Sequence, residues 1–160
     1  MHVDFKELPL ESKIWIYQSN RPFTPEEIQE IEPKLDQFIG EWTAHGATLN
    51  AGYEIRYRRF IIIGLDQSQQ GASGCSIDAS VHFIQELEKK YEVDLLDKMN
   101  VTFKQGEFIA YKALIDFKKI VKNRSVSPKT IVFNNLVNTK DEYLHDWEIP
   151  LEESWHNRFL

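Results

Sequence analysis

The only cysteine of the chain, Cys75, follows a buried-strand pattern and a loop with two glycines. This order places Cys75 at a predicted helix N-terminus, where unpaired N–H groups and the positive end of the helix dipole lie. A thiol in such a position can have a lowered pKa and act as a nucleophile. Catalysis also needs a base within reach, and the candidates are His45, His82 and Asp66. The alternative is an inert cysteine that packs in a tight loop.

The loop around Cys75 could instead bind a ligand without catalysis. Its glycines would let the backbone approach an anion or a nucleotide at the helix N–H groups. No lysine accompanies them, and a nearby aspartate would repel an anion, so a plain turn is the alternative. The candidate ligand-binding residues are Gly71, Ser73, Gly74, Ser76 and Asp78.

A dense basic cluster supplies a second possible anion site. Arg56 and Arg58 should share one face of a strand, because alternate side chains of a strand point the same way. Two guanidinium groups could clamp a phosphate or a carboxylate. The alternative is an exposed face on which they pair with acids such as Glu54.

One helix face carries residue types that bind metals. Asp78, His82 and Glu86 are spaced four residues apart. Along a helix they would spread over about 12 Å, too far for one ion to contact all three. Residues with this spacing more often form i, i+4 pairs on a solvent-exposed helix face than a metal site. We therefore predict no metal site and no cofactor.

Hydrophobic periodicity predicts the elements that hold these residues. Thr24 begins a helix with a capping box, Pro33 should kink that helix, and Gly46 should end it. Ser76 or Asp78 should cap the next one. The predicted elements of the first half are a strand at 14–17, the helix after Thr24, strands at 48–56 and 60–65, and a helix at 77–91.

In the second half of the chain, the same periodicity predicts a hairpin at 101–104 and 108–111, a helix at 113–123 and a strand at 130–133. An irregular aromatic tail follows. The order strand, helix, strand, strand, helix, strand is that of the ferredoxin-like βαββαβ fold. We therefore predict an α+β protein, with a ferredoxin-like part at 1–98 and a hairpin–helix–strand extension at 99–160. The two parts should pack as one compact unit.

Composition narrows the functional classes. The 160 residues are 42% hydrophobic, enough for a real core, and one cysteine forms no internal disulfide. The net charge of −6 argues against non-specific nucleic-acid binding. The longest apolar run is far below the roughly 20 residues of a membrane helix, and the first residues lack a signal-peptide pattern. We expect a cytoplasmic protein without membrane insertion.

Several stretches together carry a resemblance that covers the whole chain: residues 15–21, 71–78, 80–84, 130–137 and 154–156. They resemble a family of uncharacterised bacterial proteins of about this length, often labelled automatically as "ABC transporter ATPase". The residues do not support that label, because no Lys-Ser/Thr pair follows any glycine to form a P-loop. Residues 60–66 look like a Walker B strand, but the signature-like loop at 71–75 follows it, whereas in ABC ATPases the signature precedes it.

A second resemblance rests on residues 101–106, 117–121 and 127–133 and on Trp147. These stretches are similar to GYF-2-like modules, which place a helix between a hairpin and a Pro-x-Thr-x-Val strand. Such modules are taken to bind peptides or other proteins. The Gly-Pro after the first strand and the Gly-Met-x-x-Trp run are missing here, so the resemblance implies the topology without proline-rich peptide binding.

The leading hypothesis is a non-catalytic binding or adaptor module with a protein or peptide partner, or a small anion as ligand. It would use the loop at 67–76 or an aromatic and basic surface. The alternatives are an enzyme with Cys75 as nucleophile and anion or nucleotide binding at 71–78. The candidate surface residues include the tail aromatics Trp147, Trp155, His156 and Phe159, which would otherwise dock the tail onto the core. They also include the basic end of the third helix, Lys118, Lys119, Lys122, Arg124 and Lys129, which would otherwise be a solvated face.

Overall fold

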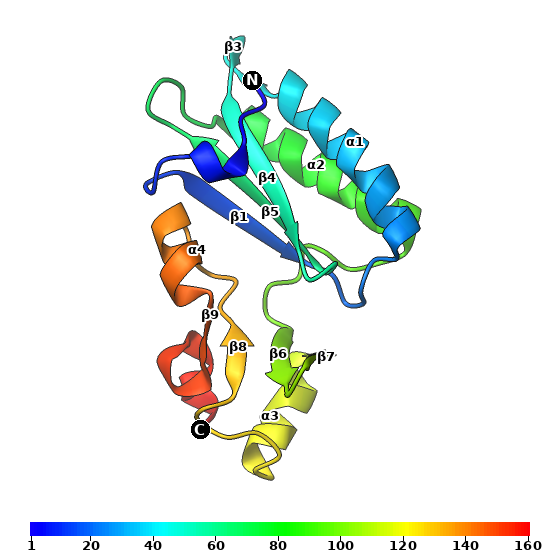
Figure 1. The fold of residues 1–160 in the computed structure, drawn as a ribbon, viewed down its shortest axis with the longest axis vertical. Helices are drawn as coiled ribbons and strands as arrows, with labels where there is room; N and C mark the ends of the chain where they lie inside the picture. The colour runs from blue at the N-terminus through cyan, green and yellow to red at the C-terminus, as the bar shows by residue number, and fades with distance from the viewer.

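The structure is a computed structural model that describes residues 1–160 as an α+β protein. The first half of the chain forms a three-stranded antiparallel sheet with two helices on one face (Figure 1). Its strand order is β1-β5-β4. The elements are β1 (Lys13–Gln18), α1 (Pro25–Glu41), β4 (Asn50–Arg56), β5 (Phe60–Asp66) and α2 (Gly74–Tyr91).

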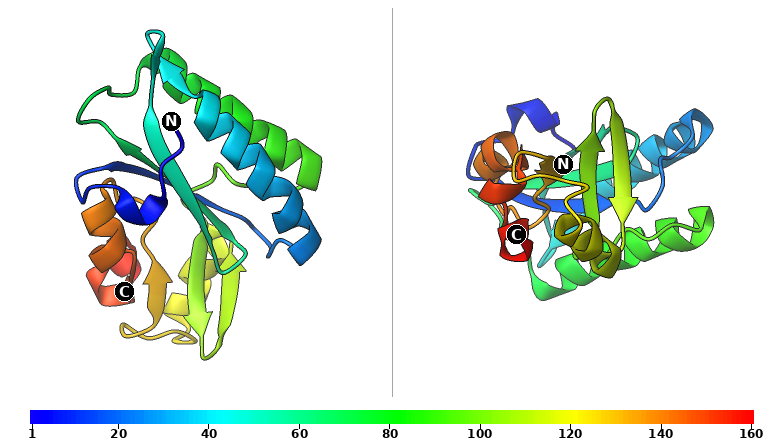
Figure 2. Two further views of the ribbon diagram at one scale, coloured as in Figure 1. Left: turned by 45° about the horizontal axis from the view of Figure 1, so that its top comes forward. Right: turned by 90° about the horizontal axis from the view of Figure 1, so that it is seen from below.

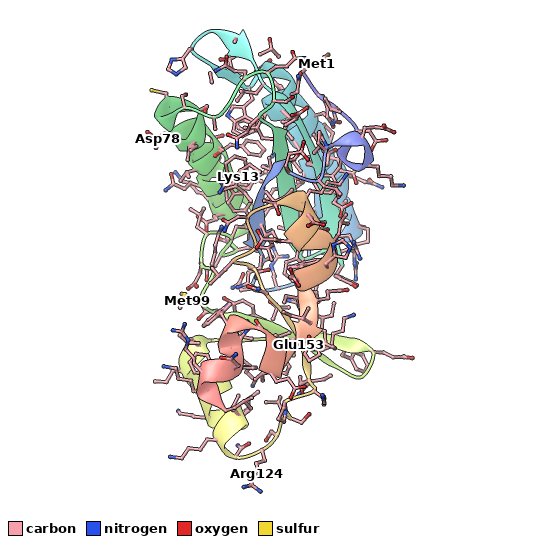
Figure 3. The ribbon with its side chains drawn as sticks, turned by 90° about the vertical axis from the view of Figure 1, so that its left-hand side faces the viewer. Met1, Lys13, Asp78, Met99, Arg124 and Glu153 are labelled. Atoms are coloured by element: carbon pink, nitrogen blue, oxygen red, sulfur yellow. The ribbon has the colours of Figure 1, made fainter.

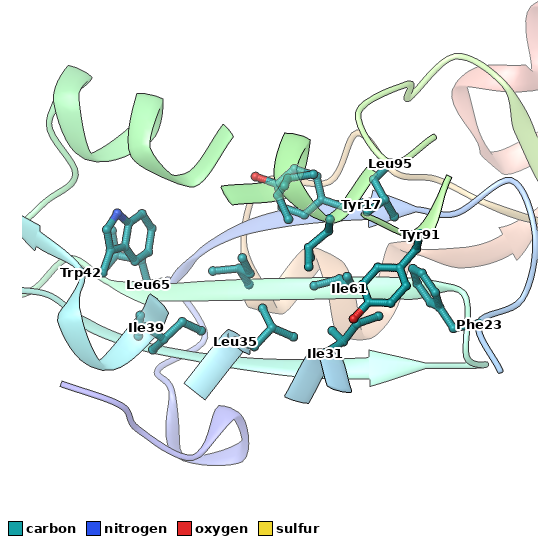
Figure 4. Packing of buried hydrophobic residues seen from close by; sticks show 14 of the residues in the cluster. Tyr17, Phe23, Ile31, Leu35, Ile39, Trp42, Ile61, Leu65, Tyr91 and Leu95 are labelled. Atoms are coloured by element: carbon teal, nitrogen blue, oxygen red, sulfur yellow. The ribbon is translucent and has the colours of Figure 1, made fainter. Parts of the chain in front are cut away.

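The central strand β5 is apolar at every position from 60 to 65 because both of its faces are covered. Ile61, Ile63 and Leu65 pack under α1 and α2 in the largest core cluster (Figure 4). Phe60 and Ile62 face the other way, into a second cluster. A strand buried on both faces shows a continuous apolar run instead of alternation, which is the pattern of this segment.

The end of α1 differs from the prediction. The capping box of Thr24 and Glu27 is present and Pro33 lies inside the helix, but α1 ends at Glu41. Gly46 forms the turn of a small hairpin, β2 (Thr43–Ala44) and β3 (Ala47–Thr48). His45 and Gly46 both have positive φ values, 51° and 77°, as a tight two-residue hairpin turn requires. The prediction that Gly46 ends the helix was therefore wrong.

Helix α2 begins earlier than predicted. Ser73 is its N-cap residue, and its side chain accepts a hydrogen bond from the backbone N–H of Ser76. The hydroxyl of Ser76 accepts one from the N–H of Ser73 at 2.7 Å. The two serines form a reciprocal capping box, so Ser76 and Asp78, the predicted caps, lie inside the helix.

The second half forms a four-stranded sheet of order β7-β6-β8-β9. The predicted hairpin, helix and strand are confirmed, whereas α4 and β9 were not predicted. The helix α4 begins with a capping box of Thr139 and Glu142, a signal that the sequence carried. The elements are β6 (Val101–Gln105), β7 (Phe108–Lys112), α3 (Leu114–Lys122), β8 (Ile131–Phe133), α4 (Lys140–Asp146), β9 (Glu148–Pro150) and the short 3-10 helices η2 (Leu151–Glu153) and η3 (Trp155–Phe159).

The ferredoxin-like detail is not confirmed. Strands β1, β4 and β5 have the order of the first three ferredoxin-like strands, but β6, the expected fourth, pairs with β7 and β8 in the second sheet. In a ferredoxin-like fold β6 would pair with the free edge of β1. Here residues just before α4 pair with part of that edge. The N–H of Ile14 donates to the carbonyl oxygen of Asn138 at 2.9 Å, and Lys13 forms an isolated antiparallel β-bridge with Thr139.

The sheet of the second half lies below that of the first half in the left view of Figure 2, and buried polar contacts join the two. The side-chain amide of Gln18, at the end of β1, donates to the carbonyl oxygens of Asp97 and Asn100. Its oxygen accepts from the hydroxyl of Thr102 at 2.7 Å and from the amide of Asn135 at 2.8 Å. One buried side chain therefore connects the first sheet to two segments of the second half.

Candidate functional site

The side chain of Cys75 is exposed in the first turn of α2. The alternative of an inert cysteine packed in the loop was therefore wrong. Its neighbour Ser76 takes the buried position. The indole N–H of Trp42 donates to the carbonyl oxygen of Ser76 at 2.8 Å, which ties the end of α1 to the start of α2. This contact brings the β2–β3 hairpin beside Cys75.

A hollow of about 410 Å³ lies between the hairpin and the start of α2. Both Cys75 and His45 line it, so the structure brings together two of the four proposed catalytic residues. The residues around them are Phe38, Glu41, Trp42, Thr43, Ser73, Ser76 and Ala79.

The other two proposed catalytic residues do not line this hollow. The Nε2 atom of His82 lies 3.1 Å from the carboxylate of Glu86 on an exposed face of α2. Asp66 ends β5, and its carboxylate accepts a hydrogen bond from the N–H of Ser68 at 2.9 Å. Each therefore has a local structural partner away from Cys75.

Several N–H groups of the loop at 67–76 already have partners within the protein. The N–H groups of Ser73 and Ser76 are used within the capping box, and the N–H of Ala72 donates to the side chain of Gln67. Glu41 adds a carboxylate to the same hollow. An anion would meet this charge without a lysine or an arginine in the lining to offset it, so the geometry gives the proposed anion site little support.

The two arginines do not share a strand face. Arg56 ends β4, and its guanidinium lies 3.6 Å from the carboxylate of Glu54 and over the ring of Trp147. Arg58 lies in the β4–β5 turn, where Tyr57 and Arg58 have φ values of 55° and 52°. The prediction that they share a strand face was wrong, because the strand ends before the second arginine. The ion pair of Arg56 with Glu54 agrees with the alternative reading.

The aromatic tail does not form one exposed patch. Trp147 is buried against Phe60 and Phe133 in the second core cluster. His156 is buried too, with its Nδ1 atom 2.6 Å from the hydroxyl of Ser154. Burial, helped by the charge of Arg158, lowers the pKa of His156 to about 4. Phe159 remains half-buried and lines a groove.

This groove, of about 750 Å³, lies between the C-terminal end of α3 and the tail. The groove lies at the end of the molecule where Arg124 is labelled in Figure 3, far from Asp78 in α2. We call it the α3–tail groove. Its lining consists of Lys118, Val121, Lys122, Arg124, Val126, Ser127, Pro128, Phe159 and Leu160.

The α3–tail groove has a basic rim. Lys118, Lys122 and Arg124 are exposed and have no acidic partner within 4 Å. The other two basic residues of this region, Lys119 and Lys129, pair with Asp116 and Glu152. The sequence showed these charges, but the groove itself depends on the tail, which local patterns did not place against α3.

Comparison with protein-family models, with curated proteins and with solved structures finds no match to this chain. No helix of the structure is both long enough and apolar enough to cross a membrane.

Proposed function

We propose that this protein is a non-catalytic binding module that holds a protein or peptide partner in the α3–tail groove. The observation that carries the proposal is that the groove combines a concave apolar lining with three basic side chains, Lys118, Lys122 and Arg124, that form no ion pair. Binding sites are usually concave and mostly apolar, with a few polar groups that orient the ligand. The groove combines these properties with more room than the hollow at Cys75.

The lining provides apolar surface that a partner can cover. Val121 and Val126 are buried at the base of the groove, whereas Phe159 is half-buried and Leu160 is 56% exposed. Apolar side chains left accessible in a concave surface commonly mark an interaction site. A peptide that covers them gains the free energy of removing apolar surface from water, about 25 cal/mol per Å².

Selection from a random peptide library displayed on phage tests the proposal. We expect the wild-type protein to enrich peptides whose binding is lost in Phe159→Ser, because the lost ring is part of the lining. The matched control is Phe108→Ser, since Phe108 is 78% exposed on β7 and lies outside the groove. Peptides that bind Phe159→Ser as well as they bind the wild type would contradict the proposal.

An enzyme with Cys75 as nucleophile is a second candidate. The observation in its favour is that an exposed thiol and His45 line the same hollow. A histidine can act as the base that activates a thiol. This candidate predicts that the reactivity of Cys75 depends on His45.

A further inference from the structure

We infer that the partner segment recognised by the α3–tail groove is acidic, with carboxylates on both sides of an apolar side chain. This inference rests on the proposed function, because it names the chemistry of the partner for the same groove. It follows from the charge distribution, from the spacing of the cations and from the nature of the lining.

The charge around the groove opposes that of the whole chain. Residues 113–130 contain five basic residues and one acidic residue, although the chain has a net charge of −6. This end of the molecule therefore carries a local excess of positive charge, and the three rim cations have no acidic partner. A local field of this kind attracts a partner of opposite charge and orients it on approach.

The spacing of the cations fits alternate residues of an extended peptide. Lys118 and Lys122 are four positions apart on α3, so they lie on the same side of the helix with a rise of about 6 Å between them. Residues i and i+2 of an extended chain are about 6.6 Å apart and point to the same side. A Glu-x-Glu segment can therefore place one carboxylate near each lysine, with Arg124 at the end of the same rim.

The lining fits an aliphatic side chain better than a nucleobase. Val121, Val126 and Pro128 supply aliphatic surface, whereas single-stranded nucleic acids bind largely by stacking bases on aromatic rings. The aromatic ring in the groove, Phe159, has the ammonium group of Lys118 5.2 Å from its centre. That ammonium group occupies one face of the ring and leaves less room for stacking.

Fluorescence anisotropy with labelled ten-residue peptides tests the inference. One peptide alternates Glu and Leu, the second alternates Gln and Leu, and a ten-nucleotide uridylate serves as the nucleic-acid probe. We expect the wild-type protein to bind the acidic peptide about tenfold more tightly than the Gln peptide, with weaker binding at high salt. The preference should disappear in the double variant Lys122→Gln, Arg124→Gln. It should remain in Lys89→Gln, Lys90→Gln, which removes two exposed lysines of α2.

The outcomes separate this inference from the proposed function. Equal binding of the two peptides, lost in Phe159→Ser, would overturn the acidic preference and leave the peptide-binding groove in place. Tighter binding of the uridylate than of the acidic peptide would overturn the inference in favour of a nucleic-acid surface. If neither peptide binds, the inference fails. The proposed function fails with it only if the phage library also yields no peptide that depends on the groove.

Discussion

Two serines at the start of α2 determine that the thiol of Cys75 is exposed to solvent. Ser73 and Ser76 bond to each other's backbone N–H groups at the start of α2, and Ser76 is the residue that points into the protein. Cys75, one position earlier, faces solvent and the hollow that His45 lines. A helix turn orients neighbouring side chains about 100° apart, so a buried serine at position 76 leaves the thiol outside.

Alkylation by iodoacetamide measures the accessibility of this thiol. We expect complete reaction of Cys75 in the folded protein, and Cys75→Ser should change the free energy of unfolding by less than about 0.5 kcal/mol, as for other surface substitutions. A thiol that reacts only after unfolding would disprove the exposed position.

The same reaction tests catalysis at Cys75. If His45 assists the thiol, His45→Gln should slow the alkylation at pH 7 several-fold, while His82→Gln should leave the rate unchanged because His82 lies outside the hollow. Equal rates in all three proteins would remove the enzyme candidate.

The buried histidine of the tail makes stability depend on pH. Burial lowers the pKa of His156 from 6.5 to about 4, so the unfolded chain binds this proton at a higher pH than the folded protein does. The neutral form of His156 therefore contributes to the free energy of unfolding fully above pH 6.5. This contribution, at most about 3 kcal/mol, is lost as the pH falls from about 6.5 to about 4. Urea unfolding at pH 7 and pH 4.5 should show a larger loss for the wild type than for His156→Gln. An equal loss in both proteins would contradict the lowered pKa.

At the level of elements, two glycines have opposite roles. Gly40 lies exposed in the last part of α1, and a Cβ there would meet no atom within 4 Å. Gly52 lies in β4, where a Cβ would overlap the carbonyl oxygen of Val3. The N–H of Val3 donates to the carbonyl oxygen of Ala51 at 2.7 Å. The close approach of the N-terminal segment to the edge of β4 therefore requires glycine at position 52.

Alanine substitutions separate these roles. We expect Gly40→Ala to raise the free energy of unfolding by about 1 kcal/mol, because alanine favours the helix over glycine. Gly52→Ala should lower it by at least about 1 kcal/mol, since the N-terminal segment has to move away from β4. Urea titration of both variants gives the two values. A stabilising effect of Gly52→Ala would contradict the close packing of this segment.

At the level of the whole molecule, Gln18 links the two sheets through four hydrogen bonds. Gln18→Leu would leave the hydroxyl of Thr102, the amide of Asn135 and two carbonyl groups without this partner. Unsatisfied buried groups cost about 1–3 kcal/mol each, so we expect a loss of at least about 3 kcal/mol. The exposed variant Gln85→Leu in α2 serves as control.

The same contacts predict cooperative unfolding. Tryptophan fluorescence and far-UV circular dichroism should follow one coincident transition in urea for the wild-type protein, because buried side chains of both halves share hydrogen bonds. Two separate transitions in the wild type would show that the halves unfold independently.

The sequence by itself determined the α+β class and most of the individual elements. The apolar run of β5 and the capping box of Thr24 and Glu27 are local signals, and the structure confirms both. The basic end of α3 was also visible, since charge needs no fold to be counted. Local signals suffice here because helix starts and buried strands depend mainly on residues close together in the chain.

Tertiary structure alone decided which of these elements meet. The edge of β1 pairs with residues 138 and 139 instead of β6, and the tail closes the groove beside α3. His45 reaches the hollow at Cys75 only because a two-residue turn and the Trp42–Ser76 hydrogen bond bring the hairpin to α2. Such pairings result from competition between segments far apart in sequence for the same buried surface and hydrogen-bonding groups, and no local periodicity records its outcome.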